Sequence, residues 1–337
     1  DVYQLDPLTL DPLGKASWVT EFNNPVGVSA HTKLDENTGE LLIFGYSAEA
    51  PYQWYGVVNP QGELVHQTAV PFPGPRLPHD IAFTENYTIF NDLPLFWNPD
   101  LIDAGIHLPT WYPELPTRFG ILPRYGTTEE VVWFDAAPTY VLHWINAYED
   151  GDEIVLDGFF QHDPSPAEQP EMSKMASLYR FLDLAQLKAR PHRWRFNLRT
   201  GECREESLTD TICEFGMMNG RYAGRPYRYS YNALAEPGMF AFNGLVKHDV
   251  QTGTEEIYRW EPGVYASETP IAPRVGATSE DDGYLVTFTS DVNRDESHCE
   301  IFDAQNLAAG PVARIRLPQR ISSGTHSCWT PAADLAV

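Results

Sequence analysis

Residues 78–90 read Pro78-His79-Asp80-Ile81-Ala82-Phe83-Thr84-Glu85-Asn86-Tyr87-Thr88-Ile89-Phe90 and predict two short strands joined by a tight turn. Apolar and aromatic residues alternate with polar ones on both sides of Glu85-Asn86, as in a half-buried strand pair. His79 lies at the mouth of the first strand, where a strand can aim its side chain toward a shared centre.

Short strands and turns alternate along the rest of the chain. Residues 41–46 predict a buried strand, and the Asn59-Pro60-Gln61-Gly62 turn joins strands at 53–58 and 63–66 into a hairpin. Similar turns are expected at 149–152, 199–201, 251–253 and 281–283. Together with 28 prolines and 13% aromatic residues, this pattern is typical of an all-β protein. Repeated hairpins over a chain of 337 residues favour a β-propeller over a sandwich.

We expect residues 1–337 to form one propeller domain, because no linker-like segment interrupts them. Residues 172–189 carry apolar side chains at roughly helical spacing and predict a helix. A shorter helical turn is expected at 99–104. Neither helix carries residues that suggest chemistry.

Composition excludes several classes of function. The net charge of −24 argues against a nucleic-acid partner and weakens any case for docking on anionic lipid. Apolar and charged contents of 42% and 21% fit a globular protein, and no apolar run reaches the length of a membrane anchor. The four cysteines show no C-x-x-C spacing, so we interpret them as reduced thiols in a cytoplasmic protein.

The ten histidines fall into two groups. Six lie mostly among Pro, Asp, Gln, Arg or Lys, as solvated residues do: His66, His107, His162, His192, His248 and His298. The other four lie in apolar or Gly/Ser-rich, strand-like settings: His31, His79, His143 and His326.

Those four are too far apart in sequence for a helical metal motif. Separations near one propeller blade, or several, would place each of them on a different inner strand, and inner strands converge on the central axis. Four imidazoles could then meet at one metal, and ligand type alone leaves Zn, Cu, Fe and Ni open. The alternative is four unrelated core histidines.

The motifs around the four histidines resemble those of the carotenoid cleavage oxygenase family. These motifs are Ala30-His31-Thr32-Lys33-Leu34-Asp35 with Thr38-Gly39-Glu40, His79-Asp80 with Thr84-Glu85-Asn86, His143-Trp144-Ile145-Asn146-Ala147-Tyr148-Glu149, and Gly324-Thr325-His326. Residues 118–126 and 224–229 also look like family segments. The resemblance runs from residue 1 to about 331, and the ending at 320–326 is most similar to the bacterial lignostilbene dioxygenase branch.

Membership of that family implies a seven-bladed propeller with one Fe(II) on four histidines. By motif, His31, His79, His143 and His326 match the iron ligands, whereas Glu214 and Glu268 match carboxylates that orient ligating imidazoles. Glu85 and Glu149, which also lie in shared motifs, are expected only to form turns or hydrogen bonds. One departure is Gly216-Met217-Met218, where the family usually has Pro after Glu-Phe, and we expect it to loosen the strand that presents Glu214.

The resemblance implies a dioxygenase that uses O2 to cleave the C=C bond of a small hydrophobic alkene, either a stilbenoid or an apocarotenoid, into two carbonyl products. It implies an apolar tunnel and no organic cofactor. Two other readings remain: a retinoid-type isomerase on the same scaffold, and a metal-free propeller that serves as a binding module.

A third orienting glutamate is expected, by resemblance, slightly more than thirty residues before the first ligand. Counting back from His31 leads to just before Asp1. The expectation is therefore that the N-terminal part of the propeller is missing from this chain, leaving strand edges unpaired. Such a chain is expected to be poorly soluble or a weak iron binder.

Overall fold

Antiparallel strands make up most of the chain in its computed structural model, which describes residues 2–102, 104–106, 108–165, 188–322, 324–332 and 335. Within those residues the strands form six sheets, three of which have four strands each. The first four-stranded sheet contains, in this order, β3 (Lys33–Asp35), β4 (Glu40–Tyr46), β5 (Tyr52–Val58) and β6 (Leu64–Pro71).

The next two sheets follow along the chain. One has the order β12-β11-β8-β7 and contains β7 (Ala82–Phe83), β8 (Tyr87–Asp92), β11 (Thr117–Pro123) and β12 (Val132–Ala136). The other runs in sequence order through β13 (Trp144–Asp150), β14 (Glu153–Phe160), β15 (Arg190–Asn197) and β16 (Cys203–Ser207).

The remaining large sheet has nine strands. They are β17 (Cys213–Met217), β18 (Tyr229–Ala235), β19 (Phe242–Asp249), β20 (Thr254–Arg259), β21 (Val264–Ala266), β22 (Ile271–Pro273), β23 (Gly283–Asp291), β24 (Glu296–Asp303) and β25 (Pro311–Arg316). Two small pairs complete the strands: β1 (Tyr3–Leu5) with β2 (Pro12–Lys15), and β9 (Leu95–Trp97) with β10 (Pro109–Trp111). Helical turns are short: α1 (Pro99–Ile102) and 3-10 turns at Ser17–Thr20, Thr128–Glu130, Gly220–Tyr222 and Leu307–Ala309.

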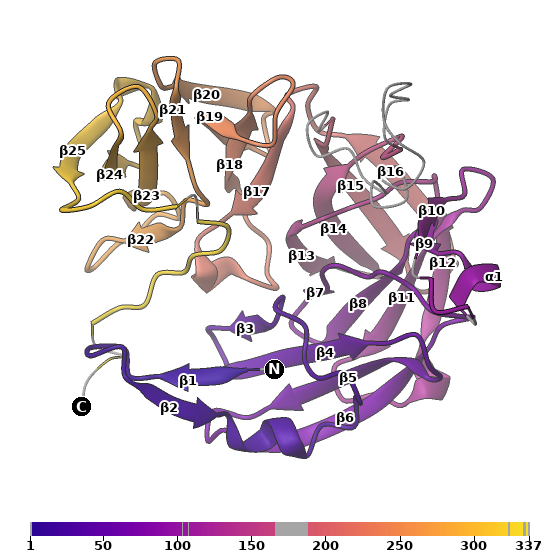
Figure 1. The fold of residues 1–337 in the computed structure, drawn as a ribbon. Coiled ribbons are helices and arrows are strands. Elements are labelled where there is room, and N and C mark those ends of the chain that lie inside the picture. The colour runs from indigo at the N-terminus through magenta and orange to yellow at the C-terminus, as the bar shows by residue number, and fades with distance from the viewer. Residues whose placement is uncertain are drawn as a thin grey trace.

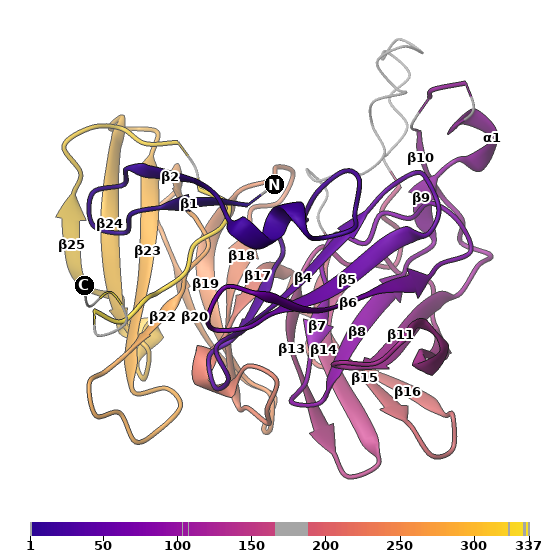
Figure 2. The same ribbon diagram turned by 90° about the horizontal axis from the view of Figure 1, so that it is seen from below.

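The large sheets stand around a common centre, with β3, β7, β13 and β17 facing it (Figure 1). Figure 2 shows the same arrangement from below, with α1 and the β23–β25 strands at opposite sides of the molecule. The all-β, propeller-like architecture expected from the sequence is thus confirmed. The sheet that ends in β25 does not pair with the β3–β6 sheet in the described residues, so the blade count of seven stays a prediction.

The hydrophobic core lies between neighbouring sheets. Leu42, Phe44 and Tyr55 of the first sheet pack against Phe83 and Phe90 of the second. Two further clusters fill the next interfaces in the same way, one around Phe119, Trp144 and Trp194 and the other around Phe159, Phe215 and Val246. Because both faces of an inner sheet are covered, these strands carry apolar side chains on both faces.

Most turns predicted from sequence lie where they were expected, whereas Gly283 of the predicted 281–283 turn is the first residue of β23. Residues 78–90 form β7, a turn and β8, and β5 and β6 pair across the 59–62 turn. Gly62 has φ 78°, a left-handed conformation that glycine adopts without steric cost. The predicted turn at 99–104 contains α1. The predicted helix at 172–189 falls almost wholly outside the described residues.

One prediction about the histidines is wrong. His248 is not solvated: it is 1% exposed, on β19 of the nine-stranded sheet. Its charged neighbours misled the interpretation, because successive side chains of a strand point to opposite faces. The Lys247 ammonium reaches Asp281 at 2.8 Å, and Asp249 accepts hydrogen bonds from Arg228.

The four cysteines, Cys203, Cys213, Cys299 and Cys328, are free thiols. Across the described ranges, none of the helices has the length and apolar content of a membrane span.

Candidate metal centre

Three of the four singled-out histidines occupy equivalent places in successive sheets. His31 precedes β3, His79 precedes β7 and His143 directly precedes β13. Because these inner strands face one centre, the residues just before their N-terminal ends bring the imidazoles together. The ring centroids lie 4.4 Å apart for His31–His79, 5.0 Å for His31–His143 and 5.2 Å for His79–His143. One nitrogen from each ring lies within 4.8 Å of the other two, a spacing that could hold a metal ion.

His326 joins this cluster from the segment that follows β25. Its ring centroid lies 4.7 Å from that of His31 and 5.5 Å from that of His143. It is the most exposed of the four, with 45% of its side chain accessible. The structure therefore brings all four predicted histidines to one place, three closely and His326 on the open side.

Glu214 forms a hydrogen bond with one ring nitrogen of His143. Its Oε2 lies 2.6 Å from His143 Nδ1, and the carboxylate, 1% exposed, also accepts the Phe215 amide N–H. The opposite nitrogen, His143 Nε2, is buried and has no hydrogen-bond partner among the described residues. With the proton on Nδ1, the Nε2 lone pair faces the other imidazoles. A buried polar atom without a partner costs free energy, so this arrangement fits a bound metal.

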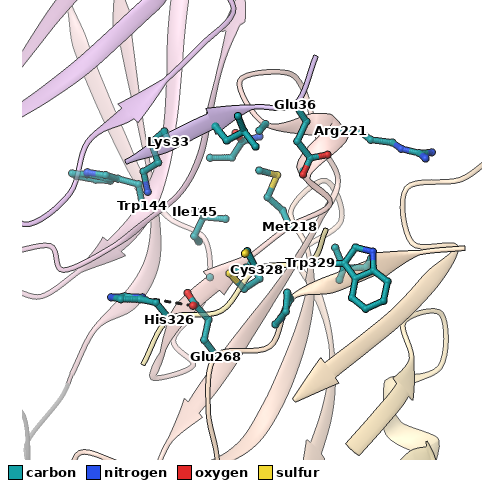
Figure 3. Close-up of a pocket in the computed structure, with 18 of the residues that line it drawn as sticks. Lys33, Glu36, Trp144, Ile145, Met218, Arg221, Glu268, His326, Cys328 and Trp329 are labelled. Atoms are coloured by element: carbon teal, nitrogen blue, oxygen red, sulfur yellow. Dashed lines mark ion pairs between the residues drawn. The ribbon is translucent and has the colours of Figure 1, made fainter. Parts of the chain in front are cut away.

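Glu268 stands in a similar relation to His326. Its Oε2 lies 3.6 Å from His326 Nδ1 and accepts the Ser327 amide N–H at 2.6 Å. Figure 3 shows the two side chains pointing toward each other, joined by the dashed line. The contact with His326 is longer than a hydrogen bond, whereas the amide contact fixes the carboxylate in place.

The electrostatics of the cluster keep two rings neutral. Burial lowers the pKa of His31 to about 3 and that of His79 to about 4. Both rings therefore retain their lone pairs at neutral pH, as metal ligands must. Burial also opposes charge on His143, but the nearby Glu214 carboxylate outweighs it, so the pKa of His143 is raised.

The strand that presents Glu214 is irregular where Gly216-Met217-Met218 depart from the family pattern. The pairing of β17 with β18 shifts register between Glu214 and Met217, and Phe215 has φ 53°. The shift does not leave Glu214 loose, since His143 and a backbone amide both hold it. The Phe215 ring stacks on the His143 ring, with 4.8 Å between the centroids and 29° between the ring planes.

A cavity of about 640 Å³ opens beside the cluster. His31, His143 and His326 form part of its wall, and most of the rest is apolar: Ile145, Phe215, Met217, Met218, Ile271 and Trp329. Figure 3 shows Ile145, Met218, Trp329 and His326 around this space. A smaller cavity of about 440 Å³ reaches His31, His79 and His326, with Tyr46 in its wall.

Sequence reasoning missed Asp80. It was noted only as part of a shared motif, yet it is 1% exposed and its Oδ1 lies 3.9 Å from His31 Nδ1. The signal was its place directly after a candidate ligand at a strand mouth. Glu149 has the hydrogen-bonding role that was expected, accepting from Thr84 Oγ1 and the Asn86 amide, and Glu85 lies in the exposed turn before β8.

Comparisons with known proteins find relatives that are named as oxygenases. The profile of a family described as "Retinal pigment epithelial membrane protein" matches residues 1–331. A pea "Carotenoid 9,10(9',10')-cleavage dioxygenase 1" is 33% identical over 91% of this chain, and the chain spans 58% of that relative's length. "Isoeugenol monooxygenase" of Pseudomonas putida is 30% identical over 97% of the chain and 70% of the relative.

The bacterial branch noted in the sequence also appears. "Lignostilbene-alpha,beta-dioxygenase isozyme III" of Sphingomonas paucimobilis is 30% identical over 99% of the chain and 71% of the relative. The crystal structure of Pseudomonas brassicacearum lignostilbene dioxygenase superposes with a TM-score of 0.84 at 28% identity, covering 98% of this chain and 71% of that one. These relatives are named as oxygenases, so the isomerase reading is not favoured.

Proposed function

The chain belongs to the carotenoid oxygenase family, and we propose that it acts as a non-haem Fe(II) dioxygenase that cleaves the C=C bond of a stilbenoid or apocarotenoid. The overall reaction, R–CH=CH–R′ + O2 → R–CHO + R′–CHO, leaves no oxygen atom over and needs no organic cofactor.

The observation that carries this proposal is the cluster of His31, His79, His143 and His326 at the wall of an apolar cavity. Neutral imidazoles suit several transition metals, and the family relationship selects iron among them. In this proposal the four histidines are the ligands, and Glu214 and Glu268 orient His143 and His326.

Bound Fe(II) would supply O2 activation and the oxidative chemistry of bond scission. The protein's own part is positional. Glu214 keeps the proton of His143 on Nδ1, so Nε2 is available to the metal. Glu268, whose Oε2 lies 3.6 Å from His326 Nδ1, acts on His326 through its charge rather than through a hydrogen bond. The Phe215 ring covers one face of His143 and, with Ile145 and Met218, keeps that side of the cavity apolar, which excludes water from a hydrophobic alkene.

A hydroxylated stilbene-like molecule is the favoured substrate. This rests on the ending at 320–326 and on the lignostilbene dioxygenases among the relatives. The alternative within the same chemistry is an apocarotenoid.

Two measurements test the proposal. Metal analysis of protein loaded anaerobically with Fe(II) should give one iron per chain, and iron-free protein with unchanged folding would instead support a metal-free binding module. After addition of O2, chromatography with mass spectrometry should show paired aldehydes from a panel of stilbenes, isoeugenol and apocarotenoids. An isomerised substrate with its carbon skeleton intact would contradict cleavage, and faster cleavage of long apocarotenoids than of any stilbenoid would overturn the substrate choice.

A further inference from the structure

One buried carboxylate, that of Asp80, bonds to three segments that carry clustered histidines. Asp80 itself directly follows His79. Its two oxygens lie 2.7 and 2.9 Å from Nζ of Lys33, two residues after His31. Its Oδ2 also accepts the backbone N–H of Trp144, directly after His143, at 3.1 Å.

Asp80 is held firmly on its own strand as well. Its Oδ1 accepts the Ile81 amide N–H at 2.8 Å, and its backbone carbonyl accepts from Asn91 Nδ2 at 2.6 Å. Asp80 is 1% exposed, whereas the Lys33 side chain, at 25%, keeps some contact with solvent. A carboxylate this deeply buried is tolerated only when paired, so the contacts with Lys33 and the two amides are obligatory in the folded protein.

The contact with the nearest imidazole is of a different kind. Asp80 Oδ1 and His31 Nδ1 are 3.9 Å apart, beyond hydrogen-bonding distance. Asp80 therefore acts on the backbone and on Lys33, unlike Glu214, which bonds directly to an imidazole.

We propose that Asp80, with Lys33, is a positioning residue that fixes the N-terminal ends of β3, β7 and β13 relative to one another, so that His31, His79 and His143 converge on one metal. The inference rests on the metal site proposed above. A metal site needs its ligands held to within about 0.5 Å, and here three of the ligands come from three different sheets. Hydrogen bonds within one sheet cannot set the spacing between sheets, and Asp80 supplies bonds that do.

Asp157 offers a matched control. It is fully buried on β14, binds Arg193 through two hydrogen bonds of 2.8 Å and accepts from Tyr227 Oη at 2.7 Å. Neither partner adjoins a clustered histidine. Asp157→Asn therefore removes a buried, paired charge as Asp80→Asn does, but away from the metal site.

The test measures metal binding directly, by competition of Co(II) and Fe(II) against a chromogenic chelator, in the unaltered protein, Asp80→Asn, Lys33→Gln and Asp157→Asn. We expect Asp80→Asn to weaken metal affinity by about 10–100-fold, the usual range for residues that orient ligands, and Lys33→Gln by about tenfold. Asp157→Asn should stay within about twofold, even though its melting temperature falls. The visible absorption band of bound Co(II), recorded at saturation, should change in Asp80→Asn and not in Asp157→Asn.

The outcomes separate the two proposals. Two outcomes would overturn the positioning role alone, provided that the unaltered protein binds metal tightly. One is a metal affinity of Asp80→Asn within about twofold of the unaltered protein's; the other is an affinity of Asp157→Asn that is weakened as much as that of Asp80→Asn. No metal binding by the unaltered protein would overturn the metal site and this inference with it. If Asp80→Asn does not fold, Lys33→Gln decides the matter, because the Lys33 side chain is partly exposed and the Ile81 and Trp144 amides still donate to the Asp80 carboxylate. Unchanged affinity in Lys33→Gln would refute the role.

Discussion

At the scale of single residues, the imidazole–carboxylate pairs carry the proposed chemistry. Burial keeps His31 and His79 neutral, and Glu214 fixes which nitrogen of His143 bears the proton. Among the described residues, His79 has no hydrogen bond or ion pair with a carboxylate, so its orientation depends on its backbone and on the neighbouring rings.

Replacement of a clustered histidine tests the ligand assignment. His143→Ala should abolish turnover and remove most of the bound iron, because this residue belongs to the clustered histidines and its Nε2 is buried without a hydrogen-bond partner among the described residues. His192→Ala is the control: His192 also pairs with a glutamate, Glu205 at 3.2 Å, but lies on β15 away from the cluster. Iron content by atomic emission and product yield would be measured for both. Full iron content and activity in His143→Ala would contradict the assignment of His143 as a metal ligand.

Glu→Gln variants test the orienting carboxylates. Glu214→Gln should keep the fold and lower metal affinity by about 10–100-fold, because an amide no longer dictates the imidazole tautomer as a carboxylate does. Glu268→Gln should have a smaller effect, since its contact with His326 is longer, at 3.6 Å. Chelator competition gives the affinities, with Glu149→Gln as the control, because Glu149 accepts hydrogen bonds from Thr84 and Asn86 and has none with a clustered histidine among the described residues. Equal affinities in all three variants would contradict the assigned roles.

At the scale of single elements, β17 is shaped by one unusual backbone conformation. Phe215 has φ 53°, which costs an L-residue about 1–2 kcal/mol relative to glycine, and it is this conformation that turns its ring onto His143. Strain of this kind persists only where the surrounding contacts hold it.

A pair of substitutions at Phe215 measures this strain. Phe215→Gly should have a free energy of unfolding about 1 kcal/mol higher than Phe215→Ala, because glycine adopts positive φ at no steric cost. Phe159, a buried phenylalanine on β14 without positive φ, should show the opposite order, with alanine better than glycine. Urea unfolding of metal-free protein gives all four values. If alanine is more stable than glycine at position 215 as well as at position 159, the conformation of Phe215 carries no strain.

β19 makes stability depend on pH through His248. Burial lowers the pKa of His248, although Glu255, Asp157 and Asp249 act in the opposite direction, and neither ring nitrogen has a hydrogen-bond partner among the described residues. The unfolded chain therefore takes up a proton first on acidification. As the pH is lowered from about 6.5, the free energy of unfolding should decrease by up to about 1.4 kcal/mol per pH unit, until the lower pKa of the folded state is reached.

His248→Leu should remove this contribution. Between pH 7 and pH 5, metal-free His248→Leu should lose less stability than the unaltered protein, because leucine binds no proton in either state. The difference between two urea-unfolding series isolates His248 from His31 and His79, which also have lowered pKa values. Parallel pH profiles would show that His248 does not titrate between the folded and unfolded states.

At the scale of the whole molecule, the sheets are joined mainly by side chains. Apolar clusters fill the interfaces, and a few buried ion pairs join one sheet to the next. Arg124, directly after β11, donates hydrogen bonds to Asp35 and Glu40 of the first sheet and to the Thr84 carbonyl of the second. A metal held by histidines from three sheets and the C-terminal segment would add a further link at the centre.

Metal binding should therefore raise thermal stability. At a free metal concentration 100 times the dissociation constant, linkage predicts about 2.7 kcal/mol of added stability. We expect a rise in melting temperature on the order of 5 °C in anaerobic scanning calorimetry. A chelator should reverse it, and His143→Ala should show no rise. An equal rise in that variant would mean that the metal stabilises the protein at another place.

Features that depend on neighbours in the chain could be predicted from the amino-acid sequence. The turn residues at 59–62 and the alternation around residues 78–90 identified hairpins, because backbone conformation and strand period are local properties. The settings of the four histidines marked them as a group, and their motifs pointed to the family that the comparisons show.

The way in which the sheets meet could not be predicted from the sequence and follows from the folded structure. That His248 is buried, that Phe215 turns onto His143, and that Asp80 reaches Lys33 and the Trp144 amide all depend on contacts between different strands or sheets. Strand alternation states that a side chain leaves one face or the other, but not which side chain it meets there. Those contacts are set by packing between sheets, which buries apolar area regardless of distance along the chain.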